Sequence, residues 1–254
     1  MDNVVDMNKY PLPEIEAMTK GNRKIGLGVM GFADMLIRLD IPYNSDKAVK
    51  LAEKIMKFIF DESKRASIEL AKRRDVFPNF VNSVFHVEGG PRYRNAATNS
   101  IATTGTISII AGCSSSIEPI FALAYRHMSY IGKTVDAVEL IEVNAIFEET
   151  AKKRGFYSKQ LMEKIAEKGS CHDIDEIPKD VKEVFVISHD IAPEWHVKMQ
   201  AAFQKYTDLA VSKTINFPFD ATIDDVQSGY LLAYKLGCKG ITIFRNESRA
   251  LQVL

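Results

Sequence analysis

The spacing of apolar residues predicts one long amphipathic helix in the first third of the chain. From Ser45 to about Arg74, apolar residues return three and four positions apart, which places them on one helix face. Ser45 is suited to cap the start of this helix, and Pro78 prevents much continuation beyond its end. Similar patterns predict shorter helices over residues 13–20, 32–39, 135–155, 157–169, 193–206 and 222–237.

Short apolar runs lie between these helices and predict strands. The runs cover residues 25–30, 95–102, 120–127, 212–217 and 239–245. Because helices alternate with most of these strands, we expect a helix-rich α/β protein with about five strands.

Composition and charge narrow the classes of partner. The chain has 254 residues, in which Lys and Arg balance Asp and Glu at 33 each. Without an excess of positive charge, neither a nucleic-acid polymer nor a membrane surface is an expected partner. No apolar stretch reaches the roughly 18 residues of a membrane span. The first 14 residues also lack the pattern of a signal peptide.

The cysteines and histidines do not form a recognisable metal site. Cys113, Cys171 and Cys238 lie far apart and are odd in number, which favours a reducing, cytoplasmic setting and excludes a CxxC zinc module. His189 and His196 lie seven positions apart, which matches no metal-ligand spacing. We therefore expect no metal in this chain, and surface or capping roles for these histidines.

Residues 26–31, GLGVMG, have the glycine spacing of a dinucleotide-binding turn. Such a turn follows a strand, opens a helix and is paired with an acidic residue about 20 positions later. Here the preceding TKGNRK is polar, and the helix from Ser45 occupies the place of the second strand. Close packing of a strand on a helix through small residues is the favoured explanation. An NAD-binding protein remains a less favoured alternative.

Residues 98–120, TNSIATTGTISIIAGCSSSIEPI, gather nine Ser or Thr residues, and Glu118 is their only charge. The segment TISII has strand propensity, and the hydroxyls are also suited to turns. A second interpretation ends a strand at residue 102 and opens a short helix at Thr106. Backbone amides at such a helix end bind phosphate without Lys or Arg. The hydroxyls of Thr104, Thr106 and Ser108 would lie beside those amides.

Residues 94–127, RNAATNSIATTGTISIIAGCSSSIEPIFALAYRH, resemble the strand–turn–helix of the ribonucleotide reductase large subunit. Three further blocks are similar to that family in the same order: NRKIGLGVMGFADML, PEWHVKMQAAFQKYTDLAVSKTINFP and YLLAYKLGCKGITIFR. The resemblance covers about residues 2–254 and is strongest to the adenosylcobalamin-dependent (class II) enzymes. Thr242 and Ile243 stand where class I enzymes carry adjacent tyrosines for radical transfer.

The resemblance implies a fold, a site and partners. The chain would be a single domain over residues 1–254, the second half of a ten-stranded α/β barrel. The phosphates of a ribonucleotide substrate would be held at the turn, and adenosylcobalamin would serve the complete enzyme. The N-terminal half of the reductase, or a second copy of the chain, would cover the open barrel. The implied phosphate-binding residues are Thr103, Thr104, Gly105, Thr106 and Ser108, of which Thr103 stands where the family has proline.

The chemistry of the family also needs cysteines that the resemblance does not place here. The radical cysteine and the redox pair lie upstream of the matched region, and the reducing tail lies downstream. None of Cys113, Cys171 and Cys238 matches these positions. The chain is therefore expected to be a fragment, a split-gene product or a truncated relative, with no catalytic residue of its own. The alternative from another class is a non-catalytic nucleotide- or phosphate-binding relative.

Overall fold

The fold is described by a computed structural model that covers residues 1–130, 137–246 and 248. Its strands are β1 (Ala124–Tyr130), β2 (Ala137–Val143), β3 (Thr214–Phe217) and β4 (Thr242–Arg245). Helices dominate, as the hydrophobic pattern predicted. They are α1 (Asp2–Met7), α2 (Pro13–Asn22), α3 (Phe32–Arg38), α4 (Asp46–Arg74), the 3-10 helix η1 (Pro78–Phe80), α5 (Gly105–Ala111), α6 (Ala145–Arg154), α7 (Lys159–Lys168), α8 (Lys179–Val184), α9 (Pro193–Gln204) and α10 (Ile223–Lys235).

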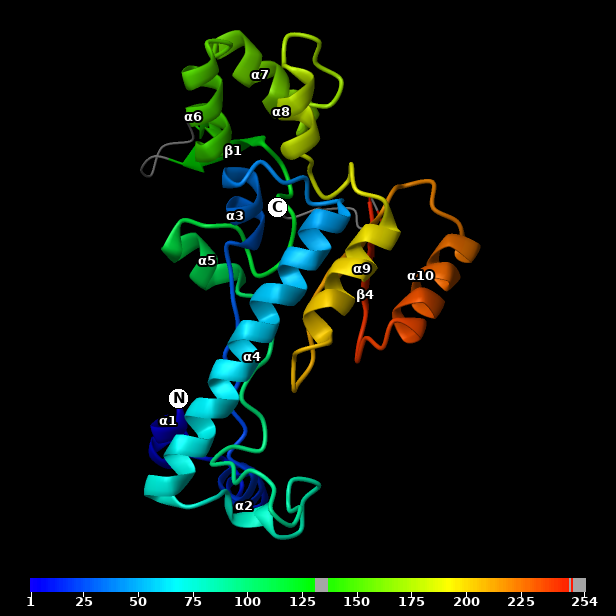
Figure 1. Cartoon of the computed structure of the whole chain (residues 1–254). Helices are drawn as coiled ribbons and strands as arrows, with labels where there is room; N and C mark the ends of the chain where they lie inside the picture. Colours follow the sequence, from blue (N-terminus) through cyan, green and yellow to red (C-terminus); the bar gives the residue numbers. More distant parts are fainter. Residues whose placement is uncertain (131–136, 247, 249–254) are drawn as a thin grey trace.

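The long helix α4 runs along the body of the molecule (Figure 1). The Ser45 side chain accepts a hydrogen bond from the amide of Ala48, which confirms the predicted cap. Small residues such as Ala48 and Ala52 are fully buried, and α4 packs against α9. Because these side chains are short, the two helices approach closely at this end.

The parallel pairing runs through four extended stretches of the chain. Leu27 pairs with Asn99, Ile101 pairs with Val211, and β3 pairs with β4, all in parallel. The predicted strands at 25–30 and 95–102 are thus present as single bridges with short runs of backbone hydrogen bonds, not as long ladders. Among the described residues, the first stretch pairs on one side only and β4 pairs only with β3. This parallel arrangement of four extended stretches, here called the row of strands, therefore has two open edges.

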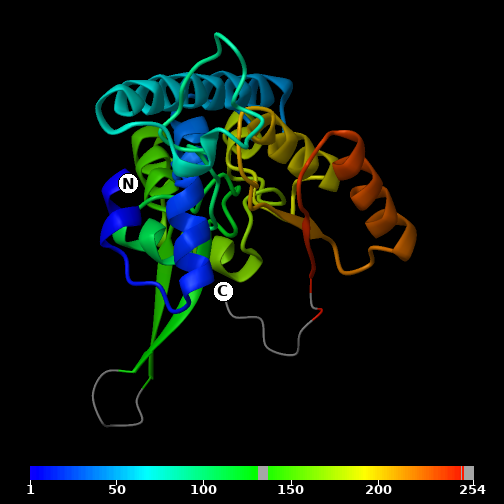
Figure 2. The ribbon, with the colours of Figure 1, turned by 90° about the horizontal axis from the view of Figure 1, so that it is seen from below.

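The helix predicted over residues 135–155 is partly wrong. Residues 137–143 form β2, which pairs antiparallel with β1, and residues 135 and 136 lie outside the described residues. Helix α6 begins only after Asn144, whose side chain accepts from the amides of Ile146 and Phe147. The run AVELIEV has three β-branched residues, and pairing with β1 overrode its helical spacing. The hairpin projects from the body of the molecule in Figure 2.

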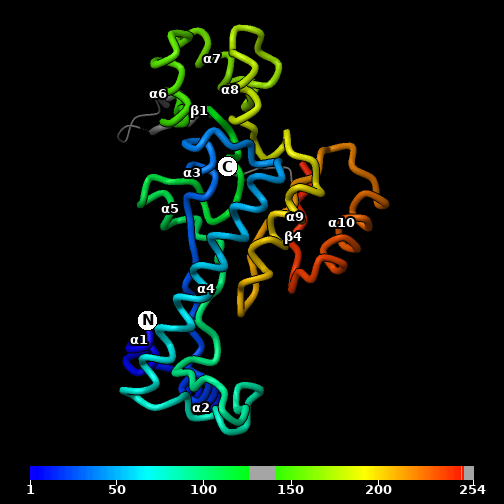
Figure 3. Tube along the Cα trace, viewed as in Figure 1, coloured from blue at the N-terminus to red at the C-terminus, as the bar shows by residue number. Residues whose placement is uncertain are grey.

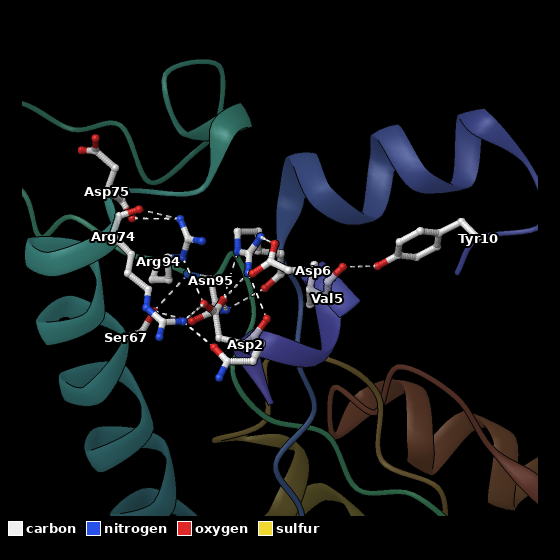
Figure 4. A network of polar contacts seen from close by, with 11 residues as sticks. Asp2, Val5, Asp6, Tyr10, Ser67, Arg74, Asp75, Arg94 and Asn95 are labelled. Atoms are coloured by element: carbon white, nitrogen blue, oxygen red, sulfur yellow. Dashed lines mark hydrogen bonds and ion pairs between the residues drawn. The ribbon is translucent and has the colours of Figure 1, made fainter. Parts of the chain in front are cut away.

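The N-terminal helices α1 and α2 lie beside the C-terminal end of α4 (Figure 3). Asp2 holds this end together, because its carboxylate accepts hydrogen bonds from Arg23 and Arg94 and from the Asn95 amide (Figure 4). These residues come from three different segments of the chain. A single buried carboxylate therefore joins α1 to the turn after α2 and to the stretch before residue 97.

The buried side chains form three apolar clusters that share elements. One joins α3, α4 and α9, another lies among α6, α7 and α8, and a small one lies between α9, β3 and α10. Helix α3 contributes Phe32 and Leu36 to the first cluster and Ala33 and Ile37 to the second. Adjacent faces of one short helix thus link the two larger clusters. None of the described helices has both the length and the apolar composition needed to cross a bilayer.

Candidate phosphate and substrate site

The predicted strand–turn–helix is present in residues 97–111. The extended stretch ends after Ile101, and α5 begins at Gly105, one residue before the predicted start. Thr104 precedes the helix in the left-handed region, with φ of 52°. The interpretation of TISII as part of a strand is therefore wrong. The first amides of α5 have no acceptor within the helix.

The five predicted phosphate-binding residues differ in their surroundings. Thr103, Gly105 and Thr106 are exposed and lie at or beside the N-terminal end of α5. Thr104 is half-buried, and its hydroxyl oxygen accepts a hydrogen bond from the amide of Ser116 at 2.8 Å. Ser108 is buried, and its hydroxyl donates to the Gly105 carbonyl at 2.9 Å. Two of the four hydroxyls among these residues therefore shape the turn itself.

Other hydroxyls of the segment have structural roles that the sequence did not reveal. Ser115 donates to the Thr103 carbonyl at 2.7 Å. The Ser114 hydroxyl oxygen accepts from the Asp34 amide at 3.2 Å, and the Asp34 carboxylate accepts from the Ser114 amide at 2.6 Å. The two bonds between Ser114 and Asp34 attach the loop after α5 to the start of α3, and the bond from Ser115 attaches the same loop to the turn before α5. They explain why several hydroxyls gather here without any cation.

An open cleft of about 1070 Å³ lies beside this segment. Its walls come from the stretch 108–122, from the junction of β2 and α6, and from β3 and β4. Ser108 is the one predicted phosphate-binding residue that lines it. The cleft lining also includes Glu118, Ser188, Thr214 and Thr242, which no pattern in the sequence marks as a site.

A buried ion pair lies under the cleft. The Lys213 side chain is 0% exposed, and its ammonium donates to the Glu118 carboxylate, to His196 Nδ1 at 3.0 Å and to the Thr214 carbonyl at 2.6 Å. The expectation of a surface or capping role for His196 is wrong, since this ring is fully buried. His189, in contrast, is half-buried. Lys213 lies 17 residues from His196 and 95 residues from Glu118 along the chain, and this separation hid the cluster from sequence patterns.

Burial sets the protonation of the buried groups. It lowers the pKa of Lys213, and the Glu118 carboxylate opposes this shift. Burial, helped by the nearby Lys213 charge, lowers the pKa of His196 to about 3. The imidazole is therefore neutral at ordinary pH. Elsewhere, burial raises the pKa of the Cys171 thiol to about 11 and raises that of Cys238 above its ordinary value, so both remain thiols.

Comparison with known proteins decides the family. Residues 1–244 match the family model described as the barrel domain of ribonucleotide reductase. The chain belongs to the ribonucleotide reductase family. The resemblance carried by residues 94–127 is thereby confirmed, and so is the helix-rich α/β fold of part of the reductase barrel.

Relatives in this family include enzymes named vitamin B12-dependent ribonucleoside-diphosphate reductases. The chain is 52% identical over its whole length to the one from Thermoplasma acidophilum and covers 32% of that protein. It is 45% identical to one from Mycobacterium tuberculosis and covers 36% of it. Among solved structures, the class Id ribonucleotide reductase alpha subunit of Actinobacillus ureae matches with a TM-score of 0.80 and 25% identity, over 97% of this chain and 44% of that one. The chain spans about a third of the length of these curated relatives.

Proposed function

We propose that this chain supplies the substrate phosphate site and part of the barrel scaffold of a ribonucleoside di- or triphosphate reductase. The exposed N-terminal end of α5 carries this proposal, because it follows a parallel strand within a reductase barrel domain. The complete enzyme would replace the ribose 2′-hydroxyl by hydrogen through thiyl-radical chemistry. The substrate would be a ribonucleotide, and the product a deoxyribonucleotide for DNA synthesis.

The proposed phosphate site uses backbone amides and one exposed hydroxyl. The amides at the start of α5 and the hydroxyl of Thr106 would donate to phosphate oxygens. Thr103 and Thr104 set the direction of the turn, since the Thr103 carbonyl and the Thr104 hydroxyl are held by Ser115 and Ser116. Ser108 would act through its bond to the Gly105 carbonyl. Gly105 leaves room for close approach, since nothing lies within 4 Å of the place of its missing Cβ.

Adenosylcobalamin would be the cofactor of the complete enzyme, which the names of the relatives suggest. It would supply the radical when bound. In the described part of the chain, no group of three or more His, Cys, Asp or Glu side chains is arranged to hold a metal ion. The residues of this chain bind and orient the substrate.

The test is a titration of the chain with inorganic pyrophosphate and with a ribonucleoside diphosphate. The Thr106→Val variant should bind both more weakly, by about 10-fold, because one hydrogen bond to a charged group is lost. Thr150→Val is the matched control, since this hydroxyl donates to the Ile146 carbonyl inside α6, far along the chain from the site. Equal affinity of Thr106→Val and the unmodified chain for both ligands would contradict the site.

A non-catalytic phosphate-binding relative is the second candidate. It is favoured by the raised pKa values of Cys171 and Cys238, which keep both thiols protonated. Adding the remaining part of a reductase distinguishes the two candidates. Turnover in the mixture supports the reductase, and phosphate binding without turnover supports the second candidate.

A further inference from the structure

Two polar side chains join the stretch 97–101 to its neighbour in the row of strands. The Asp208 carboxylate accepts hydrogen bonds from the Thr98 amide at 2.7 Å and from the Thr98 hydroxyl at 3.1 Å. The Asn99 side chain accepts from the Asp208 amide at 2.7 Å and donates to the Tyr206 carbonyl at 3.2 Å. Each stretch thus contributes one side chain that binds the backbone of the other. These contacts of Asn99 and Asp208 are here called the register clamp.

A lysine on α4 balances the charge of this carboxylate. The Lys64 ammonium donates to Asp208 at 2.8 Å, and the two side chains are 11% and 15% exposed. The ammonium also lies 5.3 to 5.6 Å from the centres of the Phe60, Phe85 and Tyr93 rings. Aromatic faces attract a cation at such distances. The Asp208 carboxylate is therefore held by α4 as well as by the stretch 97–101.

Backbone pairing by itself does not specify the register of this stretch. Its two bridges are single, from Asn99 to Leu27 and from Ile101 to Val211. A strand that slips by two residues presents the same faces and the same kind of backbone bonds. Such a slip would place Ile101 or Ala97 where the fully buried Asn99 lies, and neither apolar side chain can make its bonds. The register clamp therefore excludes the slipped arrangement.

The same stretch leads into the turn before α5. Thr103 follows Thr98 by five positions, which is about 16 Å of extended chain at roughly 3.3 Å per residue. The register clamp is thus too distant to touch a ligand at the turn. Because an extended chain has a fixed reach, a slip of this stretch would displace the turn along with it.

We propose that Asp208 is a positioning residue, which fixes the register of the stretch 97–101 and thereby the place of the turn before α5. Asn99 completes the register clamp from the other side, and Lys64 supports it by balancing the Asp208 charge. None of the three side chains binds the ligand. This inference rests on the proposed function and names the residues that hold the phosphate site in place.

Two double variants separate the register clamp from the ion pair. Lys64→Met with Asp208→Asn removes both charges but keeps a side-chain oxygen that accepts from the Thr98 amide. Lys64→Met with Asp208→Leu removes the charges and the acceptor. In titration calorimetry, the first variant should bind inorganic pyrophosphate within about twofold of the unmodified chain, since the acceptor is kept. The second should bind at least about 10-fold more weakly, because a displaced turn loses hydrogen bonds to a charged ligand.

Two further measurements distinguish positioning from a general loss of stability. Ile165→Ala removes buried apolar volume on α7 and lowers the melting temperature. At temperatures where this control is folded, its affinity for pyrophosphate should equal that of the unmodified chain. The amide resonances of Gly105 and Thr106 in NMR spectra should move in the Asp208→Leu double variant. They should keep their positions in Ile165→Ala and in the Asp208→Asn double variant.

Thr98→Val and Thr98→Ser keep the test decisive if the Asp208→Leu double variant fails to fold. Valine has the shape of threonine but lacks the hydroxyl that donates to Asp208, whereas serine keeps it. The resonances of Gly105 and Thr106 should therefore move in Thr98→Val and return in Thr98→Ser.

The outcomes separate this inference from the proposed phosphate site. Turn resonances that stay in place in a folded Asp208→Leu double variant, or in Thr98→Val, would overturn the positioning role. Equal and measurable pyrophosphate affinity of the two double variants would overturn it as well. Absence of pyrophosphate binding by the unmodified chain would contradict only the phosphate site, and displaced turn resonances would then still support Asp208.

Discussion

Individual buried charges in this protein are each held by several partners. Asp2 is 6% exposed and contacts Arg23 at 2.9 Å, Arg94 at 3.2 Å and Arg74 at 3.4 Å, with Asn95 as a further donor at 3.1 Å (Figure 4). A buried ion pair adds little net stability over apolar residues of the same size, but removing one partner leaves a buried charge unpaired. Single substitutions at such residues should therefore destabilise the protein strongly.

Replacing Asp2 by Asn should destabilise the chain strongly. The free energy of unfolding should fall by about 3–5 kcal/mol, because the buried Arg23 loses its buried carboxylate partner and Arg94 loses the same partner. Asp6→Asn is the control, since Asp6 binds the same arginine but its side chain is 50% exposed, and its loss should cost less than about 1 kcal/mol. Urea unfolding measures both. Equal effects of the two variants would contradict the importance of burial.

The same carboxylate should contribute to acid unfolding. Burial by itself would raise the pKa of Asp2, but hydrogen bonds and charges from Arg23 and Arg94 lower it below its ordinary value. As the pH falls, the Asp2 carboxylate is therefore protonated in the unfolded chain before it is protonated in the folded chain. The stabilisation is full above about pH 4 and is lost as the pH falls through the folded pKa.

His196 should make stability depend on pH in a higher range. The unfolded chain protonates this histidine below about pH 6.5, whereas the folded chain resists until about pH 3. Within that window, the free energy of unfolding should therefore fall by about 1.4 kcal/mol for each unit by which the pH is lowered. His196→Gln keeps one donor and one acceptor without titrating, so its pH slope should be smaller. Identical slopes from urea unfolding at pH 7, 6 and 5 would refute this assignment.

At the scale of elements, strand 25–28 lies unusually close to strand 97–101. A Cβ built on Gly28 would lie 2.3 Å from the carbonyl oxygen of Ser100. The backbone at Ser100 cannot move aside for an added Cβ as the end of a flexible side chain could. GLGVMG therefore serves close packing between two strands, whereas the sequence favoured packing of a strand on a helix. Gly31 comes directly before α3, and its φ of 77° lies in the left-handed region that glycine adopts without strain.

Gly28→Ala should weaken this pairing. Overpacking of this kind costs about 1–3 kcal/mol, and thermal unfolding should show the corresponding drop in melting temperature. Gly240→Ala is a matched control, because nothing lies within 4 Å of the place of its Cβ. The control should change the free energy of unfolding by less than about 0.5 kcal/mol. If both variants melt alike, the close approach of the two strands does not limit stability.

At the scale of the molecule, the parallel row of strands is open at both edges. The stretch 25–27 and strand β4 each have a single neighbour among the described residues. Unpaired edges favour association with another chain. We propose the single domain of residues 1–254 as one half of a barrel, which either a second copy or the other half of a reductase completes.

The isolated chain should not reduce ribonucleotides, even with adenosylcobalamin and a dithiol. Its mass in solution should exceed that of a monomer, or addition of the remaining part of a reductase should produce turnover. A turnover assay beside a light-scattering measurement checks both. Deoxyribonucleotide formed by a clean monomer would overturn the half-barrel proposal and the assignment of no catalytic role to Cys113, Cys171 and Cys238.

Local patterns in the sequence determined most of the elements and the family. The cap at Ser45, the helix ends at Gly155 and Gly237, and the strand–turn–helix around Gly105 were all predicted, because each depends on neighbouring residues. The tertiary structure decided the rest. Strand β2 depends on pairing with β1, and the cluster of Glu118, His196 and Lys213 depends on three distant segments meeting. Burial and long-range hydrogen bonding set these features, and neither has a short-range signature along the chain.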